Sequence, residues 1–365
     1  MKTTRRNFLQ ATTTNVLLSA LSANVFAAET VSPKIKIGQL GTGHAHAYKT
    51  GTLRKLTDCF EFIAVAEDNP QQRKNAEKQT LYKNVPWMSS EELLAIPELQ
   101  AVAVETNEHN SLEAAKRCIN AGKHIHFDKP AGNTITELAE FKKLLDEAET
   151  KKLVVQMGYM LRSNPAIQFT VNAVKNGLLG NIFDMDAAMS RYDNETARKR
   201  ISGFAGGIPF LLACHLVDLA VILLGEPDKI HSFMKQTQQD GCIDNGLFVF
   251  EYKNGSMATL RSSASEVEGF QKRYLTVRGE KGTIIVQPLE NKSNMSGGTV
   301  QLALLKNTDK FKKGYQTVTM PPLKDRYEDQ WREFAAVING SITNPYSYQH
   351  DYIVQKCLLE ACGLK

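Results

Sequence analysis

The sequence has no pair of cysteines at the two-residue spacing that zinc ribbons and redox motifs use. Its six cysteines are scattered along the chain: Cys59, Cys118, Cys214, Cys242, Cys357 and Cys362. Several of them, such as Cys118 and Cys214, lie inside apolar runs. We therefore expect buried free thiols rather than a disulfide framework.

The sequence also lacks a strong excess of charge of either sign. It holds 44 Lys and Arg against 39 Asp and Glu, and three of these basic residues, Lys2, Arg5 and Arg6, stand at the N-terminus. The rest of the chain carries 41 against 39, a formal net charge of +2. Because no Lys/Arg cluster supplies a basic face, we expect no nucleic-acid partner.

Long apolar runs are missing beyond residue 28. No later segment approaches the ~20 apolar residues that a membrane-spanning helix needs, so we expect no membrane span. Repeats and low-complexity tracts are absent as well. The 365 residues, of which 42% are hydrophobic, are enough for two globular domains.

Residues 1–28 have the parts of an export signal. Arg5 and Arg6 precede an uncharged, apolar stretch over 11–28, and small residues near its end form a plausible cleavage site. This pattern predicts a signal peptide, and the paired arginines favour the twin-arginine (Tat) route over an ordinary basic Sec signal. We therefore expect an exported, periplasmic protein.

Residues 33–155 alternate short apolar runs with amphipathic stretches. The runs IKIGQL, FEFIAVA, LQAVAVE, KHIHF and KLVVQMG are typical of strands, whereas SLEAAKRCINAG and TITELAEFKKLLDEAE have helical spacing. Thr134 and Glu137 form a capping box at the start of the second helix. This alternation predicts a parallel Rossmann sheet covered on both faces, with its ligand at the carboxyl ends of the strands.

Residues 156–365 have a different pattern. Helices are expected over 164–176, 210–224, 327–339 and 351–362. Strand-like runs separated by tight turns predict hairpins around Asn254-Gly255 and around residues 279–282. The fold class is therefore α/β, with an N-terminal Rossmann domain and a C-terminal α+β domain built on a large, mostly antiparallel sheet.

The stretch GTGHAH after the first strand is the first candidate site. Its residues are Gly41, Thr42, Gly43, His44, Ala45 and His46. Glycines between a strand and a helix let backbone N–H groups approach a pyrophosphate. Glu67 and Asp68 end the second strand, where a carboxylate holds the ribose of a dinucleotide. The cofactor prediction is NAD rather than NADP, because neither position carries an Arg or Lys; a solvated strand end is the alternative.

Two further segments carry candidate catalytic groups. Lys129 lies between Asp128 and Pro130 directly after the expected fifth strand, where its ammonium can exchange a proton with a substrate hydroxyl; a surface turn is the alternative. His215 and Asp218 are three residues apart and share a helix face. The alternative for His215 is a buried histidine with a purely structural role.

A metal site is the competing interpretation of five histidines: His44, His46, His109, His124 and His126. His124 and His126 alternate on one strand and face the same side. No set of Cys, His and carboxylate residues has the spacing of a known site, so we expect no metal.

Five motifs occur in a characteristic order: GTGHAH, AGKHIHFDKP, GYMLRSNP, GLLGNIFD and GG…CHLVDLAVILLG. Together they resemble the Gfo/Idh/MocA family of nicotinamide-dependent oxidoreductases, from about residue 34 to 363. The resemblance implies that Lys129 acts on the substrate with His215, and that Tyr159 and Arg162 line the nicotinamide and substrate side. It also implies that Thr106 and Asn107 touch the cofactor.

The chain departs from the family pattern at three positions. Asp128 replaces a glutamate, and His46 takes the small position of the glycine turn. Many members carry an acid four residues before the histidine, and here that position is Leu211. Sugar-alcohol oxidation by the usual lysine–carboxylate–histidine arrangement is therefore in question.

The resemblance leads to three functional hypotheses. The first is an NAD-dependent oxidoreductase that acts on a CH–OH group of a carbohydrate or polyol and keeps its cofactor tightly bound. The second is an NAD-dependent glycosidase or lyase that works by transient oxidation and elimination. The third, prompted by Leu211, is a catalytically degenerate sugar-binding protein. A homo-oligomer, dimer or tetramer, is expected through the strands over 246–264.

Overall fold

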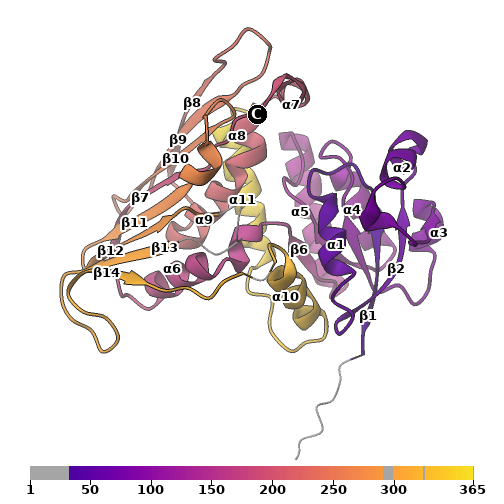
Figure 1. Cartoon of the computed structure of the whole chain (residues 1–365), viewed down its shortest axis with the longest axis horizontal. Coiled ribbons are helices and arrows are strands. Elements are labelled where there is room, and N and C mark those ends of the chain that lie inside the picture. Colours follow the sequence, from indigo (N-terminus) through magenta and orange to yellow (C-terminus); the bar gives the residue numbers. More distant parts are fainter. Residues whose placement is uncertain (1–32, 291–298, 324, 365) are drawn as a thin grey trace, which may run out of the picture. The chain divides into compact units, whose positions relative to one another are not determined.

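The computed structural model describes residues 33–290, 299–323 and 325–364 (Figure 1). The predicted signal peptide over 1–28 lies outside the described residues. None of the helices in the described part is long and apolar enough to cross a membrane.

The first sheet has six strands, all parallel, in the order β3-β2-β1-β4-β5-β6. The strands are β1 Ile35–Leu40, β2 Phe60–Ala66, β3 Trp87–Met88, β4 Ala101–Val104, β5 His124–Phe127 and β6 Val155–Met157. The five predicted strands are present, and the predicted parallel Rossmann sheet is confirmed. The strand order reverses between β1 and β4, which places the ligand crevice at the carboxyl ends of these two strands.

The helices around this sheet are labelled in Figure 1. They are α1 Thr50–Leu53, α2 Pro70–Ala76, α3 Ser90–Leu94, α4 Ser111–Asn120 and α5 Ile135–Thr150. Thr134 caps α5 as predicted, because its side chain accepts a hydrogen bond from the Glu137 amide. A short 3₁₀ turn over Ala47–Lys49 precedes α1, so the stretch after the glycine turn starts as a tight turn rather than a long helix.

The second sheet has eight strands in the order β14-β13-β12-β11-β7-β10-β9-β8. They are β7 Ile182–Ala188, β8 Lys229–Lys235, β9 Asn245–Glu251, β10 Met257–Ser263, β11 Tyr274–Gly279, β12 Gly282–Gln287, β13 Thr299–Leu304 and β14 Gly314–Val318. All neighbours are antiparallel except β7 and β10. Both predicted hairpins are present, as β9–β10 and β11–β12.

Only one face of the second sheet is packed against helices in Figure 1. These helices include α6 Pro165–Lys175, α8 Gly207–Leu212, α9 Cys214–Leu224 and α11 Tyr348–Ala361. Along β9 the burial alternates strictly, with Phe248 and Phe250 fully buried and their neighbours only half-buried. This period of two is the signature of a sheet whose other face carries no helix layer.

The predicted helix over 210–224 is wrong in one respect, since it is two helices. Helix α8 ends at Leu212 and α9 begins at Cys214, with Ala213 at the junction. The carbonyl of Leu211 is turned to other partners, the Lys129 ammonium at 2.9 Å and the Cys214 thiol at 3.4 Å. A continuous helix needs that carbonyl for its own ladder, so these contacts account for the interruption.

The remaining helices are α7 Glu195–Ile201 and α10 Glu328–Ile338, and α10 matches the predicted helix over 327–339. The C-terminal helices contact the Rossmann domain. Gln355 on α11 accepts a hydrogen bond from the Ala131 amide at 3.0 Å and donates one to the Gly132 carbonyl at 2.8 Å. These two bonds hold the loop that follows β5 and Lys129.

Candidate active site

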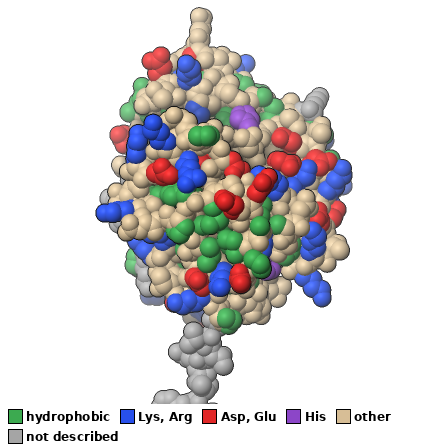
Figure 2. All heavy atoms as spheres, turned by 90° about the vertical axis from the view of Figure 1, so that its right-hand side faces the viewer, with side chains coloured by type: hydrophobic (Ala, Val, Ile, Leu, Met, Phe, Trp, Pro, Cys, Tyr) green, Lys and Arg blue, Asp and Glu red, His purple; other side chains and the backbone are tan. Residues whose placement is uncertain are grey.

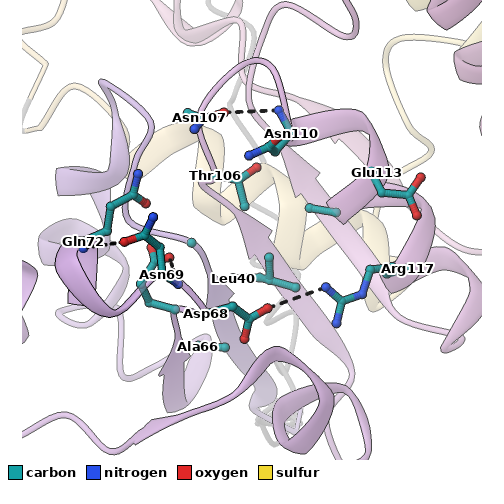
Figure 3. Close-up of a pocket in the computed structure, with 13 residues that line it drawn as sticks. Leu40, Ala66, Asp68, Asn69, Gln72, Thr106, Asn107, Asn110, Glu113 and Arg117 are labelled. Carbon is teal, nitrogen blue, oxygen red and sulfur yellow. Dashed lines mark hydrogen bonds and ion pairs between the residues drawn. The ribbon is translucent and has the colours of Figure 1, made fainter.

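A cleft of about 320 Å³ lies at the carboxyl ends of β1, β2 and β4 (Figure 3). Gly41 forms part of its floor with a φ of +87°, and a Cβ there would lie 2.6 Å from the Thr106 amide nitrogen. Only glycine fits this approach between the two turns. The Thr106 hydroxyl is buried and has no hydrogen-bond partner within the described residues. A bound polar ligand would satisfy it.

The two acids at the end of β2 point to different partners. Glu67 accepts hydrogen bonds from the Thr42 amide and hydroxyl, both at 2.8 Å, and from the Asn69 amide at 3.0 Å. It therefore fixes the glycine turn. Asp68 faces the outer end of the cleft, where it accepts a hydrogen bond from the Ser90 amide at 2.8 Å and faces Arg117 (Figure 3).

Five of the predicted cofactor residues meet in this cleft: Gly41, Glu67, Asp68, Thr106 and Asn107. Gly43 lies beside them, since its Cβ position is 3.2 Å from the Asn107 amide nitrogen. Sequence reasoning missed one wall of the cleft, which comes from Asn110, Glu113, Ala114 and Arg117. These positions recur at the spacing of one helix face, and that periodicity was the signal available in the sequence.

A buried charged cluster lies at the carboxyl ends of β4 and β5, and sequence reasoning missed its centre. The Lys49 ammonium is 2.6 Å from Oδ2 of Asp128, 3.5 Å from Oε1 of Glu105 and 2.8 Å from Nε2 of His126. All four side chains are at least nine-tenths buried. His44 completes the cluster, with Nδ1 at 3.3 Å from Asp128.

The Lys49 ammonium is shared by two carboxylates of this cluster, Asp128 and Glu105. Burial disfavours the charge of Asp128, but His44, Lys49 and His46 outweigh burial and hold its pKa well below the usual range. Burial raises the pKa of Glu105 to about 7, because Lys49 is farther from it and the charge of Asp128 opposes a second anion. Asp128 therefore carries the negative charge, and Glu105 keeps a proton up to neutral pH.

The contacts of Lys49 argue against a metal at the same place. Two sets have ligand atoms close enough for an ion, His44 with His46 and Asp128, and Glu105 with His126 and Asp128. The Lys49 ammonium already contacts every member of the second set. In the first set, Nδ1 of His44 accepts the His46 amide at 3.1 Å, and Lys49 would repel a divalent cation beside Asp128.

The main-chain amide and carbonyl of Lys129 both have partners. Its amide donates to Oδ1 of Asp128 at 2.9 Å, and its carbonyl lies 3.2 Å from Nε2 of His44. The bond from Lys129 to Pro130 is cis. The ammonium donates to the Leu211 carbonyl at 2.9 Å. Position 211, where the family resemblance leads us to expect an acid, is a leucine. Its main-chain oxygen accepts the hydrogen bond from the Lys129 ammonium instead.

His215 lies 1% exposed at the start of α9, with Nδ1 unpartnered within the described residues. Its ring packs edge-on against Tyr159, with 5.9 Å between centroids. Burial and the positive charges of Lys129, His46 and Arg326 hold its pKa well below the usual value. Burial and these nearby charges therefore favour the neutral form of the His215 ring.

Arg162 and Asp218 have partners inside the protein. The guanidinium of Arg162 donates to both oxygens of Asp218, with a shortest distance of 2.6 Å, and to Asp351 at 2.7 Å. It also stacks on Tyr346, 4.0 Å from the ring centre. This buried ion pair ties the segment after β6 to α9 and α11. The arrangement favours a structural role for both residues over the predicted contact with cofactor or substrate.

An aromatic rim beside His46 was also missed in the sequence. The Tyr327 hydroxyl donates to the Tyr48 hydroxyl at 2.7 Å, and the His46 ring lies 6.2 Å from the Tyr327 ring. Arg326 reaches the same place, 3.3 Å from the Tyr48 hydroxyl. Residues from both domains therefore meet beside His46, in the glycine turn that follows β1.

The parallel sheet, the glycine turn at its strand-order reversal and the neighbouring Lys129 and His215 define a dinucleotide-binding oxidoreductase. Residues 35–159 match the family model described as "Oxidoreductase family, NAD-binding Rossmann fold", and residues 168–285 match the "GFO/IDH/MocA C-terminal domain". The chain belongs to the Gfo/Idh/MocA family of oxidoreductases.

Known relatives include enzymes that oxidise CH–OH groups. The chain is 25% identical to the myo-inositol 2-dehydrogenase of Thermotoga maritima over 68% of this chain and 74% of that protein. It is 22% identical to the scyllo-inositol 2-dehydrogenase (NADP(+)) of Bacillus subtilis over 85% and 88%. A levoglucosan dehydrogenase in complex with NADH and levoglucosan shares the fold, with TM-score 0.72, 18% identity and coverage of 91% and 98%.

Proposed function

We propose that the protein is an NAD-dependent dehydrogenase of a sugar or polyol CH–OH group. The observation that carries the proposal is the glycine-turn cleft with its unsatisfied Thr106 hydroxyl, and the position of Lys129 against the same turn. The Lys129 carbonyl lies 3.2 Å from Nε2 of His44 in that turn, and its ammonium donates to the Leu211 carbonyl. Gly41, Thr106 and Asn107 would hold the dinucleotide along the cleft. When bound, a nicotinamide would supply the hydride acceptor for oxidation of the substrate carbon.

Lys129 and His215 would handle the proton that accompanies the hydride. Once the Lys129 side chain has given up its own proton, its amine would take the hydroxyl proton as the carbon–hydrogen bond breaks, and the carbinol becomes a carbonyl. Nδ1 of His215 is free to hydrogen-bond a substrate oxygen and orient it. The Leu211 carbonyl holds the Lys129 side chain in place without adding a negative charge.

The proposal includes an exported protein that retains its cofactor. A periplasmic oxidoreductase has no pool of free NAD(H) to draw on, so each turnover must balance its own redox change. This requirement also favours the second candidate, a glycosidase or lyase in which oxidation is reversed within the cycle. The neutral acceptor at Leu211, where the resemblance leads us to expect an acid, instead prompts the third candidate, a catalytically degenerate sugar-binding protein.

Purified protein is expected to release NAD(H) on denaturation, detected by its ultraviolet spectrum and by mass spectrometry. The same protein should convert polyols or sugars to ketones, measured by mass spectrometry of the products. Released sugar from a glycoside with no net change in cofactor would replace the first candidate by the second. An empty protein that also fails to bind added NAD would refute both.

The open face of the second sheet supports a homo-oligomer. Phe233 on β8, Met257 on β10 and Tyr315 on β14 are 58%, 48% and 67% exposed there. These side chains lie on the sheet face without a helix layer, which a second copy of the chain could cover in a symmetric pair. Light scattering is expected to give the mass of a dimer or tetramer, and Phe233→Asp should shift it toward monomer. A stable monomer in the unmodified chain would contradict the proposal.

A further inference from the structure

Arg117 is a cation at the outer end of the cofactor cleft that the proposed chemistry does not use. It lies on α4, and its guanidinium donates to the Ser90 hydroxyl at 2.6 Å. Its Nη1 atom is 3.7 Å from Oδ2 of Asp68, the acid that follows Glu67 at the end of β2. Figure 3 shows Arg117 and Asp68 pointing toward one another from opposite walls of the cleft.

The charges along the cleft are unevenly distributed. Its lining holds three acids, Glu67, Asp68 and Glu113, and Arg117 is the cation among the lining residues of the described chain. Glu67 is committed to the glycine turn through Thr42. The charge that a ligand meets at the outer end is therefore decided by Asp68 and Arg117.

The pair between Asp68 and Arg117 is loose. The two side chains are 53% and 37% exposed, and 3.7 Å is longer than a hydrogen-bonded ion pair. Asp68 also has partners of its own, since the Ser90 amide and hydroxyl both donate to it. Arg117 can therefore change partner at little cost, because exposed pairs contribute little free energy.

The end of the second strand is where the adenosine ribose of a dinucleotide lies in a Rossmann domain, and a nearby Arg accommodates a 2′-phosphate. We propose that Arg117 is a specificity-determining residue that lets this chain bind NADP as a second, weaker cofactor, with the 2′-phosphate replacing Asp68 as its partner. The proposal rests on the proposed function, because it assumes that the cleft binds a dinucleotide.

Two nucleotide fragments isolate the 2′-phosphate. Binding of adenosine 5′-monophosphate and of adenosine 2′,5′-bisphosphate to the full chain is measured by calorimetry at one fixed, low ionic strength, after any retained NAD(H) has been removed and its removal checked by mass spectrometry. Arg117→Met is expected to weaken the bisphosphate about 10-fold, the effect of one charge-assisted hydrogen bond, and to leave the monophosphate within about twofold. Asp68→Asn should tighten the bisphosphate, because it removes the competing anion.

Arg73→Met is the matched control. Arg73 lies on α2 of the same domain, is 38% exposed, pairs with Glu77 and does not line the cleft. It should change neither affinity. An equal loss in both variants, no selective loss for Arg117→Met, or no binding of the bisphosphate to the unmodified chain would overturn the proposal. If the monophosphate also fails to bind the unmodified chain, the dinucleotide site itself is refuted.

Discussion

Lys129→Met is expected to lower kcat for the proposed oxidation about 10³-fold and to leave NAD binding nearly unchanged. General acid–base groups contribute about 10²- to 10⁴-fold, and Lys129 is the group placed to accept the hydroxyl proton. The loss should appear in kcat more than in KM, since the side chain acts on the transition state. Turnover is followed by product mass spectrometry under single-turnover conditions.

Lys129→Arg separates proton transfer from charge. Arginine keeps a cation near the Leu211 carbonyl, but it does not give up its proton in proteins. Its turnover should therefore stay close to that of the methionine variant. If Lys129→Met kept full activity while sugar binding persisted, the assignment of Lys129 as the proton-transfer group would be wrong. An unmodified protein that binds sugar but shows no turnover would favour the degenerate sugar-binding hypothesis.

Lys49→Met is expected to lower the free energy of unfolding by about 3–5 kcal/mol, measured by urea denaturation. Removing one member of a buried ion pair leaves the other without compensation. Here the ammonium 2.6 Å from Asp128 is lost, and Glu105 loses its nearest cation as well. Lys123→Met is the matched control, because this lysine is also buried but bonds the carbonyls of Ile96 and Leu99 and forms no ion pair among the described residues.

The loss in free energy of unfolding caused by Lys49→Met should depend on pH. Without Lys49, the pKa of Glu105 rises further above the 4.5 of the unfolded chain, so the folded state binds the proton more tightly. The stabilisation that this proton on Glu105 provides is fully present below about pH 4.5, and it is lost as pH rises through the pKa of Glu105 in the folded state. The variant should therefore lie closer to the unmodified protein at pH 5 than at pH 8.

A double variant tests whether the charge pair itself is responsible. Lys49→Met with Asp128→Asn removes both charges and should recover part of the lost stability, giving a coupling energy in a double-mutant cycle. Strictly additive losses would mean that packing, rather than the ion pair, accounts for the effect.

The first domain was predictable because its signals are local. Continuous apolar strands, the Thr134 cap and the turn glycine at Gly41 each follow from a few neighbouring residues. The position of Lys129 followed from the order of strands in a parallel sheet. By the same reasoning Glu105, which directly follows β4, could have been placed at the site.

The interrupted helix and the buried lysine were not predictable from local pattern. The apolar run around Ala213 is a good helix by propensity, but the Leu211 carbonyl is diverted to the Cys214 thiol and to the Lys129 ammonium, which is 82 residues away in sequence. In the sequence, Lys49 is typical of an ordinary polar residue in a turn. Glu105 and Asp128 come to lie beside it only when β4 and β5 are assembled in the sheet. Such contacts exist only in the assembled fold.

The two hydrogen bonds from Gln355 set an order for building the site. Gln355 lies 224 residues after Ala131, in the last helix of the chain. At roughly 5–20 residues per second of synthesis, the loop after β5 waits roughly 10–45 s for the side chain that fixes it. The dinucleotide cleft can form early on the nascent chain, whereas the geometry around Lys129 is completed only when translation is nearly finished.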